Sequence, residues 1–351
     1  MRLYNMMRDN TVKNSASNLP ITQALQAQSG QLLPVITQAL SELQYTQIVH
    51  QRISQQYREG STEQTQESKT QITKQRSKQS CYQGITRARH VEYGSVIIKW
   101  ELCATSIRLQ SVSDLTHEIS VLQALYTSQK TQVSSITPPL LAYHNVEVDT
   151  LEQSQQLMVL VMPYYESGSL AKLLNHHVSL TDKQKHDLIK ESAHLVCNLH
   201  NAGWLHNDIK PSNILLSDNL TSHADSDCIV PDLLLTDFAL AQRNDRPNAI
   251  NFSGGTPAYL APERWQEQRA TIQSDIYAFG IMMVEILVGK RPFNIDPQSN
   301  QSMTDWAIQH CQQSIPKLPL EYVRYQSIVD KALAKRIEKR YQSMDEVIAN
   351  L

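Results

Sequence analysis

The spacing of apolar residues predicts short strands early in the chain and helices in its second half. Apolar runs at 94–100 and 157–162 are typical of β-strands, and the spacing over 113–126 is typical of a helix. Helical spacing then dominates three later segments, at 182–201, 274–288 and 325–335. Strands followed by helices predict an α+β fold with a small β-rich lobe and a larger α-helical lobe.

Residues 1–78 differ from the rest, because they are rich in Gln, Ser and Thr. After Pro34, an imperfect stripe of apolar residues predicts a helix over 34–58, and the polar stretch 60–79 has no period and is typical of a linker. Two interpretations stay open. The segment is either a solvated extension, or a helix that docks on the folded domain or on a partner protein.

The composition sets limits on size and partners. With 351 residues, of which 41% are hydrophobic, the chain can bury a sizeable core. A formal net charge of −2 gives no broad basic field, so we expect no nucleic-acid partner. The first residues, MRLYNMMRDN, carry no apolar run, so no signal peptide is expected, and the longest apolar stretch, 276–288, is too short to cross a bilayer. We therefore expect a cytoplasmic protein without a membrane partner.

The five cysteines lie far apart in the sequence, and no C-x-x-C pair occurs among them. They are Cys81, Cys103, Cys197, Cys228 and Cys311. Their dispersal fits a reducing compartment and predicts neither a metal site nor a disulfide framework.

Candidate chemistry begins at LHNDIKPSNIL, residues 205–215, where an acid, a cation and an amide lie close together. Asp208 can accept a hydroxyl proton, Lys210 can neutralise a phosphate, and the Asn213 amide oxygen can ligate Mg²⁺. Downstream, the apolar run LLLTD delivers Asp237, and an acid at the end of a buried strand is costly unless it is paired or binds a metal.

Two further motifs follow: GTPAYLAPERW at 255–265, and an apolar segment from 274 to 293 that opens with Asp275. The chain thus carries four motifs in a fixed order: HxDxKxxN, DF, APE and this apolar segment. In this order they resemble the catalytic domain of protein kinases, most closely the eukaryotic-like Ser/Thr kinases of bacteria. The resemblance covers about 79–351. It implies the bilobal kinase fold, with the N-lobe at about 79–162, the C-lobe at about 166–351 and the Gln-rich extension 1–78 before them.

The resemblance also implies roles for individual residues. Asp208 would be the catalytic base, Lys210 the cation at the γ-phosphate, and Asn213 and Asp237 the ligands of Mg²⁺ or of Mn²⁺ in its place. The implied ATP-binding residues are Lys99, its partner Glu118, Gln83, Gly84, Ile85, Ile97, the gatekeeper Met162, and the backbones of Pro163 and Tyr165. Asp275 would anchor the catalytic loop, and Glu263 would pair with Arg340.

The sequence departs from the family pattern at the phosphate-binding loop. The three expected glycines fall on Gln79, Cys81 and Gln83, with Gly84 one place late, so we expect weak ATP binding. Ala239 replaces the glycine of DFG and is expected to be strained if its φ must be positive.

A second departure concerns regulation. Asn207 replaces the arginine that binds a phosphorylated activation loop in the family, so loop phosphorylation is not expected to be the on-switch. The function implied is transfer of the ATP γ-phosphoryl group to Ser/Thr hydroxyls of protein substrates, the chain itself included. The alternative is a pseudokinase scaffold that binds nucleotide weakly or not at all. A small-molecule phosphotransferase fits less well, because such enzymes generally lack the GTPAYLAPE segment.

Overall fold

The fold of most of the chain is described by a computed structural model, in which the protein divides into two compact units. The described residues are 18–60, 77–104, 114–128, 135–150, 154–175, 180–217, 232–245, 254–296, 298–299 and 301–351. The first unit comprises 1–116 and 140–164, and the second comprises 117–139 and 165–351.

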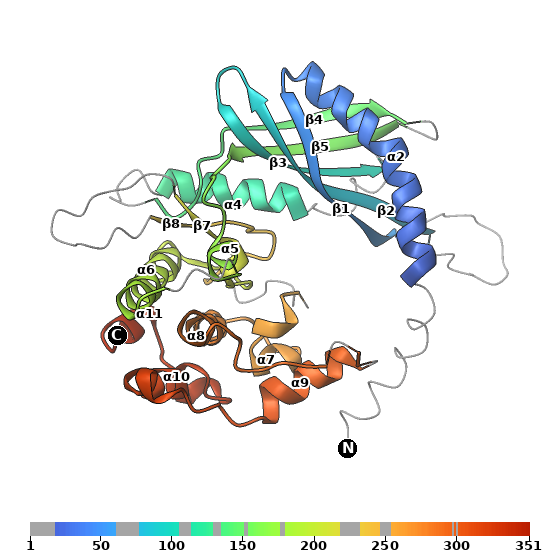
Figure 1. The fold of residues 1–351 in the computed structure, drawn as a ribbon. Helices are drawn as coiled ribbons and strands as arrows, with labels where there is room; N and C mark the ends of the chain where they lie inside the picture. The colour runs from blue at the N-terminus through green and yellow to red at the C-terminus, as the bar shows by residue number, and fades with distance from the viewer. Residues whose placement is uncertain are drawn as a thin grey trace. The chain divides into compact units, whose positions relative to one another are not determined.

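The first unit is built on an antiparallel sheet of order β1-β2-β3-β5-β4 (Figure 1). The strands are β1 (Thr46–Gly60), β2 (Ser77–His90), β3 (Gly94–Ala104), β4 (Ala142–Asp149) and β5 (Ser154–Pro163). In β3, Val96, Ile98 and Trp100 are buried while Ile97 and Lys99 between them are half-buried, as expected for side chains that alternate between the two faces of a sheet.

Helix α2 (Asn18–Glu42) runs diagonally across one face of this sheet (Figure 1). Ile36 and Leu40 of α2 are fully buried, in one apolar cluster with Ile98 and Trp100 of β3. Burial of large apolar side chains is the main favourable term in folding, so α2 is part of the core of this unit.

The helix predicted for 34–58 is therefore wrong beyond Glu42, because 46–58 lie in β1 and pair with β2. Pro34 does not open the helix but lies inside it. The strand pairing explains the error, since β1 is rich in Gln, which has a good intrinsic helix propensity, and pairing with β2 overrides that propensity. The boundary predicted at 78 falls within β2, and the predicted linker lies largely in 61–76, outside the described residues.

A chain of hydrogen bonds links α2 to the sheet and defines the tautomer of one histidine. The Thr37 hydroxyl donates to Leu33 C=O at 2.7 Å, so it accepts the 2.9 Å bond from Nε2–H of His50. His50 Nδ1 then accepts from the Thr86 hydroxyl at 2.8 Å, and that hydroxyl accepts from the Trp100 indole at 2.9 Å. Burial lowers the pKa of His50, which favours this neutral form.

Substitution of Leu40 tests whether α2 belongs to the core. We expect Leu40→Ala to lower the free energy of unfolding by about 2–5 kcal/mol, because it leaves a cavity against the sheet. Gln38→Ala, at an exposed position on the same helix, is the matched control and should change stability by less than about 0.5 kcal/mol. Urea denaturation measures both, and equal stability of the two variants would show that α2 does not pack as described.

The second unit is mainly helical. Its principal helices are α6 (Asp182–Asn201), α8 (Ile272–Val288), α9 (Ser302–Gln312), α10 (Gln326–Ala332) and α11 (Met344–Ile348), with the short α5 (Leu170–Asn175) and α7 (Pro262–Trp265). Helix α4 (Asp114–Ser128) crosses the division between the units. The helix predicted at 182–201 is confirmed as α6, and that at 274–288 as α8 with an earlier start. The segment 325–335 forms only the shorter α10.

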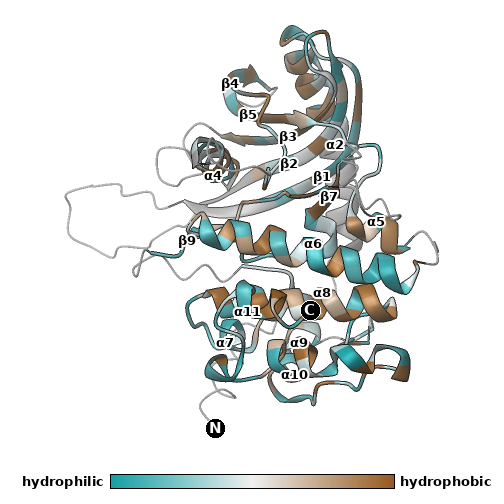
Figure 2. Cartoon of the chain, turned by 90° about the vertical axis from the view of Figure 1, so that its left-hand side faces the viewer, coloured by the Kyte–Doolittle hydropathy of each residue, from teal (hydrophilic) through white to brown (hydrophobic). Residues whose placement is uncertain are grey.

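Helix α8 is largely buried in the interior of this unit. It is almost entirely apolar, whereas α6 carries a hydrophilic side (Figure 2). An αL residue, Gly289, ends α8 as a left-handed cap that only glycine adopts readily. No helix among the described residues is long and apolar enough to cross a membrane.

Two short strand pairs carry the loops that hold the predicted catalytic residues. Strand β6 (Trp204–Leu205) pairs with β9 (Gln242–Arg243), and β7 (Ile214–Leu216) pairs with β8 (Leu233–Leu235). These pairs place the segment after β6 and the segment after β8 beside each other, although they are about thirty residues apart in the chain.

His310 is buried inside a cage of aromatic rings. Its ring lies 5.2–6.3 Å from those of Trp265, Tyr277, Phe293 and Trp306, and its Nδ1 is 3.0 Å from the Tyr277 hydroxyl. Burial, with a contribution from the charge of Lys335, lowers the pKa of His310 to about 3.

This burial predicts acid lability. The unfolded chain protonates His310 below its ordinary pKa of 6.5, but the folded chain does so only near 3, so stability falls as the pH drops through this window. Between pH 7 and 5 the loss from this one residue is about 2 kcal/mol. His310→Asn should reduce the pH dependence by that amount in urea titrations at the two pH values. An unchanged pH dependence in the variant would contradict the expectation.

The sequence predicted no disulfide framework, but the structure contains a disulfide. Cys81 of β2 and Cys103 of β3 form a disulfide with a Cα–Cα distance of 4.6 Å. They are 22 residues apart in the chain, and the register of the two strands places them directly opposite each other. Cys197 and Cys311 are free thiols, and Cys228 lies outside the described residues.

Candidate active site

The loop after β6 is held in place by one buried carboxylate from α8. Asp275 accepts hydrogen bonds from the backbone N–H groups of His206 at 2.8 Å and Asn207 at 2.9 Å, and lies 3.0 Å from Nε2 of His200. Burial would raise the pKa of Asp275, but the bonds to His200 and His206 outweigh it and lower that pKa. Asp275 thus anchors the loop, as the resemblance implies.

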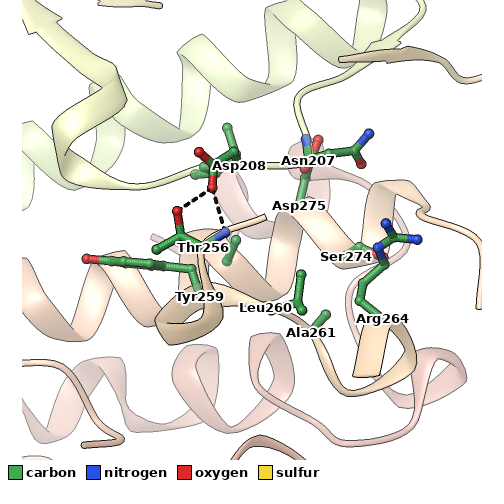
Figure 3. A pocket seen from close by; sticks show the side chains of 11 residues that line it. Asn207, Asp208, Thr256, Tyr259, Leu260, Ala261, Arg264, Ser274 and Asp275 are labelled. Carbon is green, nitrogen blue, oxygen red and sulfur yellow. Dashed lines mark hydrogen bonds between the residues drawn. The ribbon is translucent and has the colours of Figure 1, made fainter. Parts of the chain in front are cut away.

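The three predicted catalytic residues meet at the Asp208 carboxylate. Oδ1 accepts from the Thr256 hydroxyl at 2.7 Å and from its N–H at 3.0 Å (Figure 3). Lys210 Nζ lies 2.5 Å from Oδ2 and 2.6 Å from the Thr256 hydroxyl oxygen. Asn213 Nδ2 donates to the Asp208 C=O at 3.0 Å and to Oδ2 at 3.1 Å. The carboxylate is therefore oriented from several sides.

Asp237 is brought beside Asn213 by the β7–β8 pair. The N–H of Thr236 donates to the Asn213 C=O at 3.0 Å, and Asp237 follows with a φ of 70°. Because Nδ2 of Asn213 is committed to Asp208, its Oδ1 is the atom left to act as a ligand. A carboxylate and an amide oxygen at one place fit a hard cation such as Mg²⁺.

The condition for strain at Ala239 is not met, because the positive φ in this segment lies on Asp237 instead. Alanine in place of glycine therefore has little cost at position 239. The positive φ has a modest cost at Asp237, because aspartate tolerates this conformation better than most residues. Next to it, Phe238 is buried against the His206 ring at 5.0 Å, and its N–H donates to Oε1 of Glu118 at 3.4 Å.

The first unit contains most of the residues predicted to bind ATP. Lys99 lies in the middle of β3, opposite Ile85 of β2 and Leu160 of β5. Ile97 and Ile85 share the face of Lys99, which is opposite the face covered by α2. The pairing of Lys99 with Glu118 joins residues of different units and stays a prediction.

Two of the predicted phosphate-loop residues are corrected. Gln83 and Gly84 lie inside β2, paired on both sides, so they form no loop. A Cβ on Gly84 would lie 2.1 Å from the Trp100 ring, so glycine is needed here for packing on the α2 face. The connection between β1 and β2 is formed instead by residues 61–76. Because this segment contains no glycine, the sequence carries no sign of a phosphate loop there.

Two of the predicted hinge residues lie at the end of strand β5 in the same sheet. Met162 is buried at the end of β5 opposite Ile97, and Pro163 is opposite Val96. Tyr165 begins the second unit. The contacts of the Pro163 and Tyr165 backbones with adenine stay predictions.

The implied ion pair between Glu263 and Arg340 is present and buried. Arg340 Nη2 lies 2.7 Å from Oε2 and Nη1 lies 2.8 Å from Oε1 of Glu263, which also accepts from the Ser274 hydroxyl at 2.6 Å. Burial opposes ionisation of Glu263, but the two bonds from Arg340 outweigh it and lower its pKa.

One functional contact gave no signal in the sequence. The Asn207 side chain donates from Nδ2 to the C=O of Leu240 at 2.7 Å, which joins the catalytic loop directly to the segment after Asp237. Asn207 has a φ of 66°, a conformation that asparagine adopts more readily than most residues.

Comparison with known proteins agrees with this geometry. The protein kinase domain matches residues 101–350, well over half of the chain. This chain belongs to the protein kinase family. It is 31% identical over 205 residues to the probable serine/threonine-protein kinase PknB of Lactococcus lactis, which covers 57% of this chain and 30% of the relative.

Two other protein kinases are similar to this chain at a comparable level of identity. The probable serine/threonine-protein kinase pknA2 of Bifidobacterium longum is 34% identical over 156 residues, or 44% of this chain and 19% of the relative. The L-type lectin-domain containing receptor kinase V.9 of Arabidopsis thaliana is 32% identical over 191 residues, or 51% and 26%. The matches span about a third or less of each relative's length. The resemblance to bacterial-type Ser/Thr kinases is confirmed at the level of the family.

Proposed function

We propose that this protein kinase transfers the γ-phosphoryl group of ATP to serine or threonine hydroxyls of protein substrates. The observation that carries the proposal is the hydrogen bond from the Thr256 hydroxyl to Asp208, because a substrate hydroxyl would donate to the same carboxylate. Asp208 takes the hydroxyl proton as the oxygen attacks, and Lys210 offsets negative charge on the transferring group.

Protein kinases generally use ATP with Mg²⁺, and the donor set here fits that pair. Asn213 and Asp237 would hold Mg²⁺ or Mn²⁺, which neutralises charge on the phosphate oxygens. Lys99, with its partner Glu118, would bind the α- and β-phosphates. Ile85, Ile97, Met162 and the backbones of Pro163 and Tyr165 would contact adenine. The lack of glycine in 61–76 supports weak ATP binding.

The test is transfer of radiolabelled γ-phosphate to the chain itself and to a generic basic protein, followed by mass spectrometry of the acceptor residue. Label on serine or threonine supports the proposal, and label on the chain itself supports autophosphorylation. If folded protein transfers no label and calorimetry shows no ATP binding, the scaffold function is the better account. The N-terminal segment 1–78 would then be the first part to test for a protein partner.

We further propose that activity does not need phosphorylation of the activation loop. The bond from Asn207 to Leu240 supports this, because it orders the start of that segment without a phosphate. Ser253, outside the described residues, is the test position. Ser253→Ala should keep kcat/KM within about 2-fold, whereas Asn207→Ala should lower it by about 10-fold through loss of a partly buried hydrogen bond. A large loss in Ser253→Ala contradicts the proposal.

A further inference from the structure

A block of four side chains on one face of β2 and β3 has no role in the proposed reaction. Cys81 lies directly opposite Cys103, and the next pair on the same face is Gln83 opposite Glu101. Cys81, Glu101 and Cys103 have exposures of only 0%, 3% and 6%. Two sulfurs and a carboxylate are thus enclosed together within the first unit.

The three potential ligand atoms are close enough to share one ion. One ligand atom from each of Cys81, Glu101 and Cys103 lies within 4.8 Å of the others. Oε1 of Glu101 is 3.6 Å from Sγ of Cys103. In a tetrahedral zinc site, with Zn–S near 2.3 Å and Zn–O near 2.1 Å, neighbouring sulfur and oxygen ligands are about 3.6 Å apart. The sulfur–oxygen spacing already matches that geometry.

Gln83 gives the carboxylate a defined orientation. Its Nε2 donates to Oε2 of Glu101 at 2.8 Å, while Oε1 is the oxygen that lies nearest Cys103. Hydrogen bonds of this kind to a ligating carboxylate commonly orient it toward the metal and contribute to metal affinity.

The charges point to a divalent cation. If both thiols ionised beside Glu101, three negative charges would share one buried place, which is unfavourable without a compensating cation. Thiolates favour soft or borderline metals such as Zn²⁺, and a carboxylate is a common third ligand of zinc.

We propose that Cys81, Cys103 and Glu101 bind a thiophilic divalent cation of the Zn²⁺ class when the two cysteines are reduced. Reduction of the disulfide by two equivalents of a small thiol, RSH, yields two cysteine thiols and RSSR. The cation then displaces both thiol protons and forms two metal–sulfur bonds, with Glu101 as the third ligand and two protons released to solvent. The disulfide and the metal site exclude each other, because both use the same two sulfurs.

Cobalt titration of the reduced full-length chain tests this. We expect one Co²⁺ per chain, with a thiolate-to-cobalt absorption band that is lost in Cys81→Ser, in Cys103→Ser and in the oxidised protein. Glu101→Gln should keep the band but weaken Co²⁺ binding by about 10-fold or more. Zn²⁺ should displace the cobalt and bleach the band.

Cys197 provides a matched control, because its thiol lies 3.3 Å from the Asp345 carboxylate but belongs to no group of potential metal ligands among the described residues. Burial and Asp345 raise the pKa of Cys197 to about 11, and Cys197→Ser should leave the cobalt band unchanged. Absence of the band in reduced wild type, or an equal band in Cys81→Ser, overturns the proposal. If the serine variants do not fold, unchanged Co²⁺ affinity in Glu101→Gln overturns the site as described.

Discussion

Asp208→Asn is expected to lower kcat for phosphoryl transfer by about 10²–10⁴-fold while KM for ATP changes by less than about 3-fold. The amide keeps the size of the side chain and can still accept from Thr256, but it cannot take a proton from the attacking hydroxyl. The bonds from Lys210 and Asn213 to Oδ2 lose the charge that strengthens them. The measurement is initial-rate kinetics of label transfer at several ATP concentrations.

Asp296→Asn is the matched control for this substitution. Asp296 is an exposed aspartate in the same unit, so the change in charge is equal but lies outside the catalytic loop. We expect its kcat to remain within about 2-fold of wild type, since exposed single charges contribute little. Equal activity of Asp208→Asn and wild type would exclude Asp208 as the base, and equal thermal melting of the two variants would show that folding is not the cause of any loss.

Arg340→Met is expected to lower the free energy of unfolding by about 3–5 kcal/mol, because it leaves the buried Glu263 carboxylate without its cation. Arg340 also donates to the C=O of Ala334 at 2.7 Å and of Gln273 at 3.0 Å, so several acceptors lose their donor. Urea denaturation at pH 7 measures the loss. Arg336→Met, at an exposed position nearby, should cost less than about 0.5 kcal/mol.

The pH dependence distinguishes a lost charge pair from lost packing. In wild type, Arg340 holds the pKa of Glu263 below its ordinary value, whereas in Arg340→Met burial is expected to outweigh the remaining bond from Ser274 and to raise that pKa. A folded-state pKa above the unfolded value favours the folded chain as the pH falls, so the destabilisation should be smaller at pH 5 than at pH 7. Adding Glu263→Gln should recover part of the loss at pH 7. A loss that is independent of pH and unaffected by Glu263→Gln would identify packing as the cause.

The catalytic loop was predictable because its chemistry is local in the chain. Asp208, Lys210 and Asn213 are separated by only a few residues, so their spacing alone brings an acid, a cation and an amide together. The approach of Asp237 to this loop was implied by the order of motifs that the chain shares with its family, whereas the contact of Thr256 with Asp208 was not predicted. Their distances, and the bond from Asn207 to Leu240, required the folded chain.

The N-terminal part was predicted poorly for a specific reason. The conformation of 46–58 depends on its partner strand, and the Gln residues that recur along it favour a helix when judged by propensity alone. The sequence pattern assigned Gly84 to a phosphate loop because glycine has that use in the family. In the folded chain its missing side chain makes room for Trp100.

The sequence alone was enough to identify the family and the α+β order of the elements, and it predicted which residues would be the acid, the cation and the metal ligands, because such information lies in short motifs and in apolar periodicity. The folded chain was needed to show that β1 joins the sheet and α2 packs on it, that Cys81 meets Cys103 beside Glu101, and that the Asp208 carboxylate receives bonds from several sides. These features depend on strand register and on side-chain packing between distant segments, and a pattern of single residues along the chain carries neither.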